Sequence, residues 1–201
     1  MNEAAAHYHH GNLRSALLDA AARKIETDGV DRLSLRELAR ELGVSHGAPA
    51  RHFADRHALL DALAARGREQ LGDELAEAMA QPADGFEAGL AAFARGYVSF
   101  AAAHPALAVL ALTRRDADAA ARPEPVAAAE RTFGRAQRLV ADAQASGEIV
   151  GDDPDRVALA VLALVHGLAT MVANDMAGPG DPGYLITGTV QTLVSGLLPR
   201  E

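Results

Sequence analysis

The chain has 201 residues, enough for one large domain or for a small domain joined to a larger one. It has no cysteine, which excludes a disulfide framework, a thiolate nucleophile and cysteine-ligated metal, and fits a reducing, cytoplasmic setting. The net charge of −8 argues against a nucleic-acid partner, but the first 60 residues are neutral, with eight basic and eight acidic side chains. With 49% hydrophobic and only 4% aromatic residues, the composition favours packed helices over sheets, and we expect an all-α fold.

The N-terminal residues before Gly11 have no helical pattern and predict a loose arm. Its histidines, His7, His9 and His10, run directly into a helix start, which favours a native segment over a purification tag. The arm lacks the apolar run of a signal peptide, which again indicates a cytoplasmic protein. Histidines become partly cationic next to phosphates, so the neutral N-terminal part can act as a local cationic face, although an ordinary mixed-charge surface is the simpler interpretation.

The first expected helix begins with Asn12 as its cap, and an apolar residue recurs every fourth position from Leu13 to Ile25. Gly29 ends it. The spacing places one apolar stripe against a core. We therefore expect a short amphipathic helix at the start of a compact bundle.

The stretch from Leu33 to Phe53 predicts two short helices joined by a tight turn. Ser34 can cap the first helix and form a capping box with Glu37. Gly43 can take the left-handed conformation that ends this helix, and Ser45 can cap the second one. This is the pattern of a helix-turn-helix, whose second helix carries small and hydrogen-bonding residues suited to base edges and phosphates.

The remaining sequence predicts six more helices, which makes about nine in total. They begin after Asp55, after Asp84, near Ala106, near Pro125, at Pro154 and near Tyr184. We divide the chain into an N-terminal arm and helix-turn-helix domain, residues 1–55, and a larger helical C-terminal domain, residues 56–201.

The segment that follows Pro154, VALAVLALVHGLATMVA, is apolar on every side and lies at the lower edge of membrane-span length. Aspartates crowd both of its ends, so we expect a soluble helix that packs partly against a second subunit instead of a membrane span. Together with the last helix it would form a four-helix bundle in a homodimer. The residues expected at the dimer interface are Val161, Val165, Leu168, Ile186, Val190, Leu193, Val194 and Leu197.

The arm, the motif LSLRELARELGVS followed by HF, and Ala-Leu-Leu at the start of the next helix resemble the TetR-type (tetracycline repressor-like) transcriptional regulators. VHGLATMVA is similar to the subgroup whose C-terminal domain carries Trp-His-Gly, with Val165 in place of the tryptophan. The resemblance implies a homodimer that binds a pseudo-palindromic double-stranded DNA operator, commonly as a repressor. The DNA-binding residues it implies are Ser34, Arg36, Ser45, His46, Gly47, Ala48, Ala50, Arg51, His52, Arg56, His9 and His10.

Two positions depart from the family pattern. Ala50 stands where the family has an aromatic residue that binds phosphate, which should weaken binding by about 1–2 kcal/mol per head. Pro49 removes a helical hydrogen bond and predicts an irregular or late-starting recognition helix. A helical dimer that has lost DNA binding and serves as an interaction protein is therefore an alternative.

The family also implies a small apolar or amphipathic effector. His166 and Asn174 are candidate polar anchors, and the alternative for His166 is a buried core histidine. The expected pocket residues, which plain core packing would equally explain, are Phe93, Tyr97, Phe100, His104, Leu110, His166, Thr170, Met171 and Asn174. An enzyme using His166 is less favoured, because the spacing matches no catalytic motif, and we predict no catalytic residue, cofactor or metal site.

Overall fold

The computed structural model describes residues 13–113, 123–151, 153–178 and 181–197, and only the backbone of residues 123–131. Regular structure in these ranges consists of eight α-helices and two short 3-10 helices. They are α1 (Leu13–Asp28), η1 (Val30–Arg32), α2 (Leu35–Glu41), η2 (Pro49–Arg51), α3 (Arg56–Ala78), α4 (Gly85–Ala103), α5 (Pro105–Thr113), α6 (Pro123–Ser146), α7 (Pro154–Ala173) and α8 (Pro182–Leu197). The all-α prediction is confirmed, and the expected ninth helix is the 3-10 helix η2.

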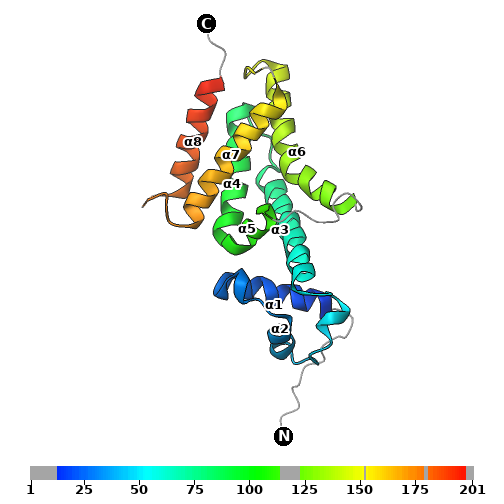
Figure 1. Cartoon of the computed structure of the whole chain (residues 1–201). Helices are drawn as coiled ribbons and strands as arrows, with labels where there is room; N and C mark the ends of the chain where they lie inside the picture. Colours follow the sequence, from blue (N-terminus) through cyan, green and yellow to red (C-terminus); the bar gives the residue numbers. More distant parts are fainter. Residues whose placement is uncertain (1–12, 114–122, 152, 179–180, 198–201) are drawn as a thin grey trace.

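The helices form a small group and a larger bundle at opposite ends of the molecule (Figure 1). The small group, which we call the head, consists of α1, η1, α2 and η2 with the turns between them. From the head, α3 runs up into the larger bundle. There α4 is central, because it packs against α3, α5, α6, α7 and α8.

The hydrophobic core of the head follows from the spacing of apolar residues on α1. Leu17, Ala21 and Ile25 recur every fourth residue, and each is at most 1% exposed. Leu38 of α2 and Phe53, which follows η2, are buried in the same core. Burial of an aliphatic or aromatic side chain of this size contributes about 1.5–3 kcal/mol. These side chains therefore fix α1 and α2 against each other.

The predicted starts of α2, α3 and α7 are correct, but not all of their predicted hydrogen bonds form. Asp55 accepts a bond from the Ala58 N–H at 2.8 Å, and Asp153 accepts one from the Asp155 N–H at 3.0 Å, so both predicted caps are confirmed. Ser34 occupies the N-cap position of α2 without a side-chain bond to it. The predicted capping box is therefore wrong.

Glu37, the expected partner of Ser34, contacts a different helix. Its carboxylate lies 3.2 Å from Nζ of Lys24 on α1. An ion pair with a neighbouring helix thus replaces the local bond that the sequence pattern predicts, and it ties α2 to α1.

Three polar contacts connect α1, α3 and α5 in pairs. The Glu26 carboxylate of α1 accepts bonds from the first free N–H groups of α5, those of Ala106 and Leu107, at 2.9 and 3.0 Å. Arg68 of α3 donates to the last-turn carbonyl of Ala111 in α5 at 3.1 Å. Arg66 of α3 forms an ion pair with Asp19 of α1. These contacts are possible because α5 turns away from α4 by 113° at His104 and Pro105.

The apolar helix α7 is buried on one side only. Val161 and Val165 are at most 2% exposed, and α7 packs on α4 and α6. Leu159, on the opposite side, is 59% exposed. By length and composition α7 is the one described helix that could by itself cross a membrane, although core helices of soluble proteins pass the same test.

Candidate nucleic-acid interface and effector site

The turn after α2 has the backbone geometry that the sequence predicts. Gly43 has φ of 67°, in the left-handed region where a side chain would be strained. Its N–H donates to the Arg40 carbonyl at 3.2 Å, and the Val44 N–H donates to the Ala39 carbonyl at 3.0 Å. This pair of bonds is the Schellman motif, which satisfies the last carbonyls of α2 and redirects the chain.

The second half of the motif is a set of tight turns instead of an α-helix. Because Pro49 has no N–H, it cannot donate an intrahelical bond, and regular structure is limited to η2. The His52 and Phe53 N–H groups both donate to the Pro49 carbonyl at 2.9 Å. The prediction of an irregular, late-starting recognition helix is confirmed. Ser45 as its side-chain cap is wrong, since η2 starts after Ala48 and has no side-chain cap.

The residues from Ser45 to His52, which we call the reading turn, form an almost continuous exposed strip. Ala48 is half-buried and Pro49 is buried, so Pro49 anchors the turn to the head. The other six are exposed: Ser45, His46, Gly47, Ala50, Arg51 and His52. The structure therefore brings most of the predicted DNA-binding residues onto one short segment.

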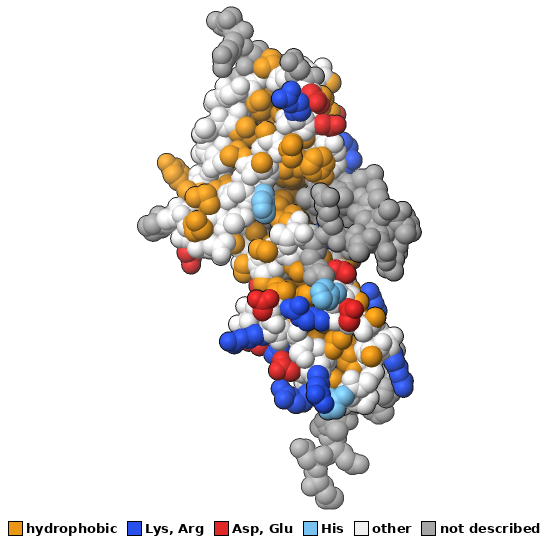
Figure 2. Space-filling view, in the orientation of Figure 1, with side chains coloured by type: hydrophobic (Ala, Val, Ile, Leu, Met, Phe, Trp, Pro, Cys, Tyr) orange, Lys and Arg blue, Asp and Glu red, His pale blue; other side chains and the backbone are white. Residues whose placement is uncertain are grey.

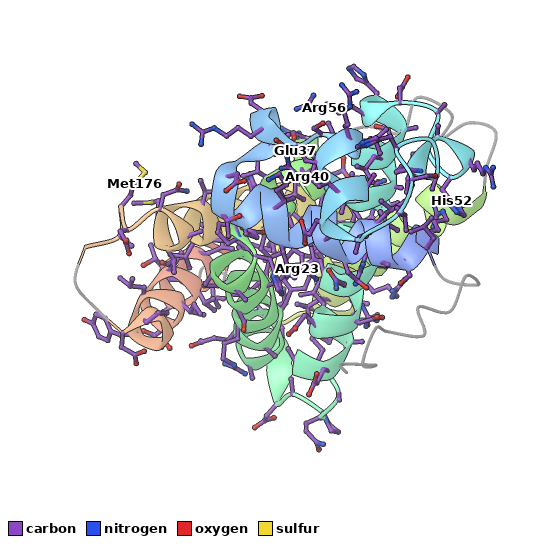
Figure 3. The ribbon with its side chains drawn as sticks, turned by 90° about the horizontal axis from the view of Figure 1, so that it is seen from below. Arg23, Glu37, Arg40, His52, Arg56 and Met176 are labelled. Atoms are coloured by element: carbon purple, nitrogen blue, oxygen red, sulfur yellow. The ribbon has the colours of Figure 1, made fainter. Side chains whose placement is uncertain are left out.

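The other predicted DNA-binding residues are dispersed. Arg36 is exposed on α2, and Ser34 is half-buried at its start. His9 and His10 lie outside the described residues. Figure 3, seen from the head end, shows His52 and Arg56 on the head side and Met176 well to one side of them.

Arg56 has an internal role that the sequence did not indicate. Its Nε donates to the Leu33 carbonyl at 3.1 Å, and its Nη2 donates to the Val30 carbonyl at 2.6 Å. Both carbonyls lie in the connection between α1 and α2. The guanidinium is partly buried and ties that connection to the first residue of α3. This geometry disagrees with the implied role of Arg56 as a phosphate ligand.

Part of the positive charge of the head is neutralised by ion pairs. Arg23 lies 3.3 Å from Glu41, and Lys24 lies 2.8 Å from Asp28. The hydrogen bond from Lys24 holds the pKa of Asp28 below its ordinary value, and the bonds to Asp28 and Glu37 raise the pKa of Lys24. Within the described residues, the head's exposed arginines without an ion pair to a carboxylate are Arg14, Arg32, Arg36, Arg40 and Arg51.

Two of the predicted effector residues, Tyr97 and His166, contact each other. The Tyr97 hydroxyl of α4 lies 3.3 Å from Nδ1 of His166 on α7, and the two rings are T-shaped to each other. Burial raises the pKa of Tyr97 to about 12. The hydroxyl can donate to Nδ1 of His166 in the tautomer that leaves this nitrogen without a proton. His166 itself is exposed, so its interpretation as a buried core histidine is wrong.

The other predicted effector residues lie on two sides of that pair. On α4 and α5, Phe93, Phe100 and Leu110 are buried, and the rings of Phe100 and His104 lie 5.5 Å apart. On α7, Thr170, Met171 and Asn174 are exposed. The hydroxyl of Thr170 and the amide of Asn174 donate to α7's own carbonyls. The arrangement is a cluster of buried aromatic side chains beside the exposed, polar His166.

An open groove of about 560 Å³ runs between α7 and α8. Its lining is Leu164, Gly188, Thr189, Thr192, Leu193, Gly196 and Leu197. Of the eight residues predicted for the dimer interface, Leu193 and Leu197 line this groove. The other six are buried in the chain's own core: Val161, Val165, Leu168, Ile186, Val190 and Val194.

This distribution corrects the predicted interface. The six buried residues belong to the faces of α7 and α8 that lie inside the chain's own core, and the groove is lined by leucines together with glycines and threonines. Small residues recur at every fourth position of α8, at Gly188, Thr192 and Gly196. This spacing places them on one face of the helix, and it could have identified that face as the one that lines the groove.

Two family models match the sequence. The model for bacterial regulatory proteins of the tetR family matches residues 17–63, which span most of the head and the start of α3. The model for the tetracyclin repressor-like C-terminal domain matches residues 90–193. No curated protein matches the sequence.

Solved structures with the same fold cover nearly the whole chain. A protein of unknown function from Rhodococcus sp. RHA1 is 43% identical, with a TM-score of 0.83 over 96% of this chain and 98% of that one. A regulatory protein in the tetR family from Rhodococcus RHA1 is 19% identical, with a TM-score of 0.70 over 94% and 98%. FadR from Bacillus subtilis, solved in complex with stearoyl-CoA, is 22% identical, with a TM-score of 0.71 over 91% and 98%.

Proposed function

The chain belongs to the TetR family of bacterial transcriptional regulators, and we propose that it is a homodimeric repressor released from a pseudo-palindromic operator by a small molecule. The observation that carries the proposal is the exposed reading turn, residues 45–52, presented by a compact head at one end of the molecule. A major groove about 12 Å wide admits a segment of this size. The Trp-His-Gly subgroup remains a prediction.

The surface of the reading turn supports DNA as the partner. Gly47 and Ala50 are small and exposed, so the backbone can approach base edges closely. Arg51 supplies a guanidinium, which can bind guanine or phosphate through two parallel hydrogen bonds. On the face shown in Figure 2, most of the charged side chains gather on the head, and the larger bundle is mainly apolar or uncharged. The exposed arginines of the head without an ion pair, such as Arg51, would supply the electrostatic part of the interaction.

The open face of α7 and α8 supports a second copy of the chain as the dimer partner. The groove between these helices is lined by leucines and by small residues, and the small residues let a partner helix approach closely. Two helices from each chain would form a four-helix bundle. A partner seated in this groove would cover apolar surface of α7 with protein, so α7 needs no membrane, in keeping with a cytoplasmic protein.

The Tyr97–His166 pair supports an effector with an apolar body and a polar end. The buried rings of Phe93 and Phe100 would contact the apolar part once the cluster opens. The polar end would replace or join the hydrogen bond between Tyr97 and His166. Stearoyl-CoA, the molecule bound to FadR, has this combination of properties and is a suitable first probe.

The boundary between the two domains is part of the proposal. We assign residues 1–55 to DNA binding and residues 56–201 to effector binding and dimerisation. Asp55 caps α3, and α3 passes from the head into the larger bundle, so a movement of the bundle would be transmitted along it.

One alternative has an observation in its favour. Because η2 replaces a full recognition helix and Ala50 offers no phosphate donor, the chain could serve as a dimeric interaction protein without DNA binding. An enzyme that uses His166 is less well supported, because the sequence spacing matches no catalytic motif. DNA binding decides between the regulator and the interaction protein.

Fluorescence anisotropy with labelled duplexes tests the regulator. The probes are DNA flanking the protein's own coding sequence and a scrambled duplex of equal length, in NaCl from 50 to 200 mM. We expect tighter binding to the flanking DNA and a steep loss of affinity with salt. Arg51→Ala should remove the discrimination, whereas Arg95→Ala on α4 is the matched control. Equal, salt-insensitive binding of both duplexes by the wild type would support the interaction protein.

Sedimentation and ligand titration test the dimer and the effector. Leu164→Glu in the groove should give a monomer, whereas Leu112→Glu on α5 should not, and a dimeric Leu164→Glu protein would contradict the proposed interface. Stearoyl-CoA should release the DNA, and Tyr97→Phe should weaken that release about 2- to 10-fold, the effect of one hydrogen bond. Release at the same concentration in both proteins would remove Tyr97 from the site.

A further inference from the structure

Arg14 lies at the start of α1, beside the end of the reading turn. Its guanidinium carbon is 5.4 Å from the centre of the Phe53 ring, and Phe53 directly follows the reading turn. Contacts between α1 and η2 hold these parts of the head together. The contact with the ring therefore holds a cation beside Phe53, the residue that directly follows the reading turn.

The charge of Arg14 is available to an external partner. The side chain is exposed, and within the described residues no carboxylate forms an ion pair with it. Further along α1, by contrast, Arg23 and Lys24 are both paired. A guanidinium held over an aromatic ring has five N–H donors, and the ring accepts no conventional hydrogen bond from them, so they remain for hydrogen bonds to a partner. Phosphate oxygens accept hydrogen bonds of this kind.

Arg56 has the opposite character. Two of its nitrogens already donate to the carbonyls of Val30 and Leu33, and its side chain is partly buried between the α1–α2 connection and α3. Turning this guanidinium toward DNA would break both bonds and leave two carbonyls without their partner. These contacts indicate that Arg56 holds the α1–α2 connection against the start of α3 inside the head.

We propose that Arg14 is a phosphate-binding residue of the head and that Arg56 is a positioning residue, which holds the frame of the reading turn without contacting DNA. The inference rests on the proposed DNA-binding function. Arg14, at the start of α1, would then make a salt-sensitive contact with a DNA phosphate. Arg56 would make no contact with phosphate.

The salt dependence of DNA affinity measures phosphate contacts directly. Each contact contributes about 0.9 to the slope of log affinity against log salt, so Arg14→Met should lower the slope by about 1.8 for two heads. Between 50 and 200 mM NaCl, the wild type should then lose about tenfold more affinity than the variant. Arg14→Lys should keep the slope, since lysine also binds phosphate. Arg95→Met removes the same charge from the larger bundle and should leave the slope unchanged.

The same titration on Arg56→Met completes the test, at a temperature where circular dichroism shows the variant folded. We expect a lower melting temperature with an unchanged slope. If the wild type binds duplexes without salt dependence, the proposed function fails. If the wild type binds steeply but Arg14→Met keeps its slope, or Arg56→Met loses as much slope as Arg14→Met, this inference is overturned. The Arg14 pair of variants decides the question even if Arg56→Met does not fold.

Discussion

Two glycines of the head and two glycines on α4 in the larger bundle have different surroundings. A Cβ added at Gly43 or Gly47 in the head would meet no heavy atom within 4 Å. In the bundle, a Cβ on Gly89 would lie 2.7 Å from Leu139, and one on Gly96 would lie 2.9 Å from Ala78. At Gly43 the residue must be glycine because of its positive φ. At Gly89 and Gly96 the absence of a side chain lets α4 pack closely against neighbouring residues.

This difference shows that the two regions are specified by different forces. The path of the chain through the head is set by backbone turns and by side chains that bond to backbone atoms, as Arg56 does. The bundle is set by side-chain volume, because α4 is in contact with five other helices. A change of volume should therefore harm the bundle most, and a lost hydrogen bond should harm the head most.

The largest expected effect comes from Phe93→Ala in the bundle. Phe93 is fully buried, so the truncation removes apolar contacts and leaves a cavity, at a cost of about 3–5 kcal/mol in the free energy of unfolding. Urea unfolding followed by circular dichroism measures it. Phe133→Ala, at a ring that is 37% exposed, is the control and should cost clearly less. Equal losses would show that the bundle core is not tightly packed around Phe93.

Arg56→Met should be the most damaging single change to the hydrogen bonds of the head. It removes two bonds from a cation to carbonyls, which together contribute about 2–3 kcal/mol. Thermal unfolding of this variant and of Arg36→Met, whose guanidinium is exposed, makes the comparison. Arg36→Met should stay within about 0.5 kcal/mol of the wild type. A similar loss in both would mean that Arg56 does not hold the α1–α2 connection against α3.

A pair of glycine substitutions compares the two regions directly. Gly96→Ala places a methyl group 2.9 Å from Ala78 and 3.2 Å from the Glu74 carbonyl, so it should destabilise by about 1–2 kcal/mol. Gly47→Ala enters open space and should leave stability unchanged or raise it by up to about 1 kcal/mol. Urea midpoints measure both. If Gly47→Ala lowers the free energy of unfolding more than Gly96→Ala does, the proposed difference between the two regions is wrong.

The smallest expected effect is the loss of a helix cap. Asp55→Ala removes the acceptor for the Ala58 N–H and should cost about 1 kcal/mol. Asp153→Ala removes the equivalent bond at α7. Since this bond is local in both regions, the two variants should lower the unfolding midpoint by similar amounts. A loss several times larger at Asp55 would indicate that the start of α3 carries more of the head's stability than its cap.

Local features of the fold were predictable from the sequence. The four-residue spacing of Leu17, Ala21 and Ile25 predicts the buried face of α1, because periodicity is a property of one helix. Gly43 and Asp55 predict a helix end and a helix start for the same reason. Pro49 predicts the irregular reading turn, since the missing N–H removes a bond in any context.

Contacts between distant segments were not predictable in the same way. Glu37 binds Lys24 on another helix instead of Ser34, and nothing near Arg56 in the sequence marks Val30 as its acceptor. The exposure of His166 depends on which way α7 is rotated against α4, and α7 is apolar all round. For the same reason the sequence could not tell which face of α7 would pack inward.

The contacts that connect α1, α3 and α5 in pairs have a mechanical consequence. The pairs Asp19–Arg66, Arg68–Ala111 and Glu26–Ala106 close a triangle of three helices. Because each of the three helices contacts the other two, none of them can slide past its neighbours without breaking one of these contacts. A helix attached to a single neighbour could change its angle much more easily. The head is therefore attached to the larger bundle through α5 as well as through α3. For the head to change its orientation relative to the bundle, α1, α3 and α5 must move together, or one of the three contacts must break.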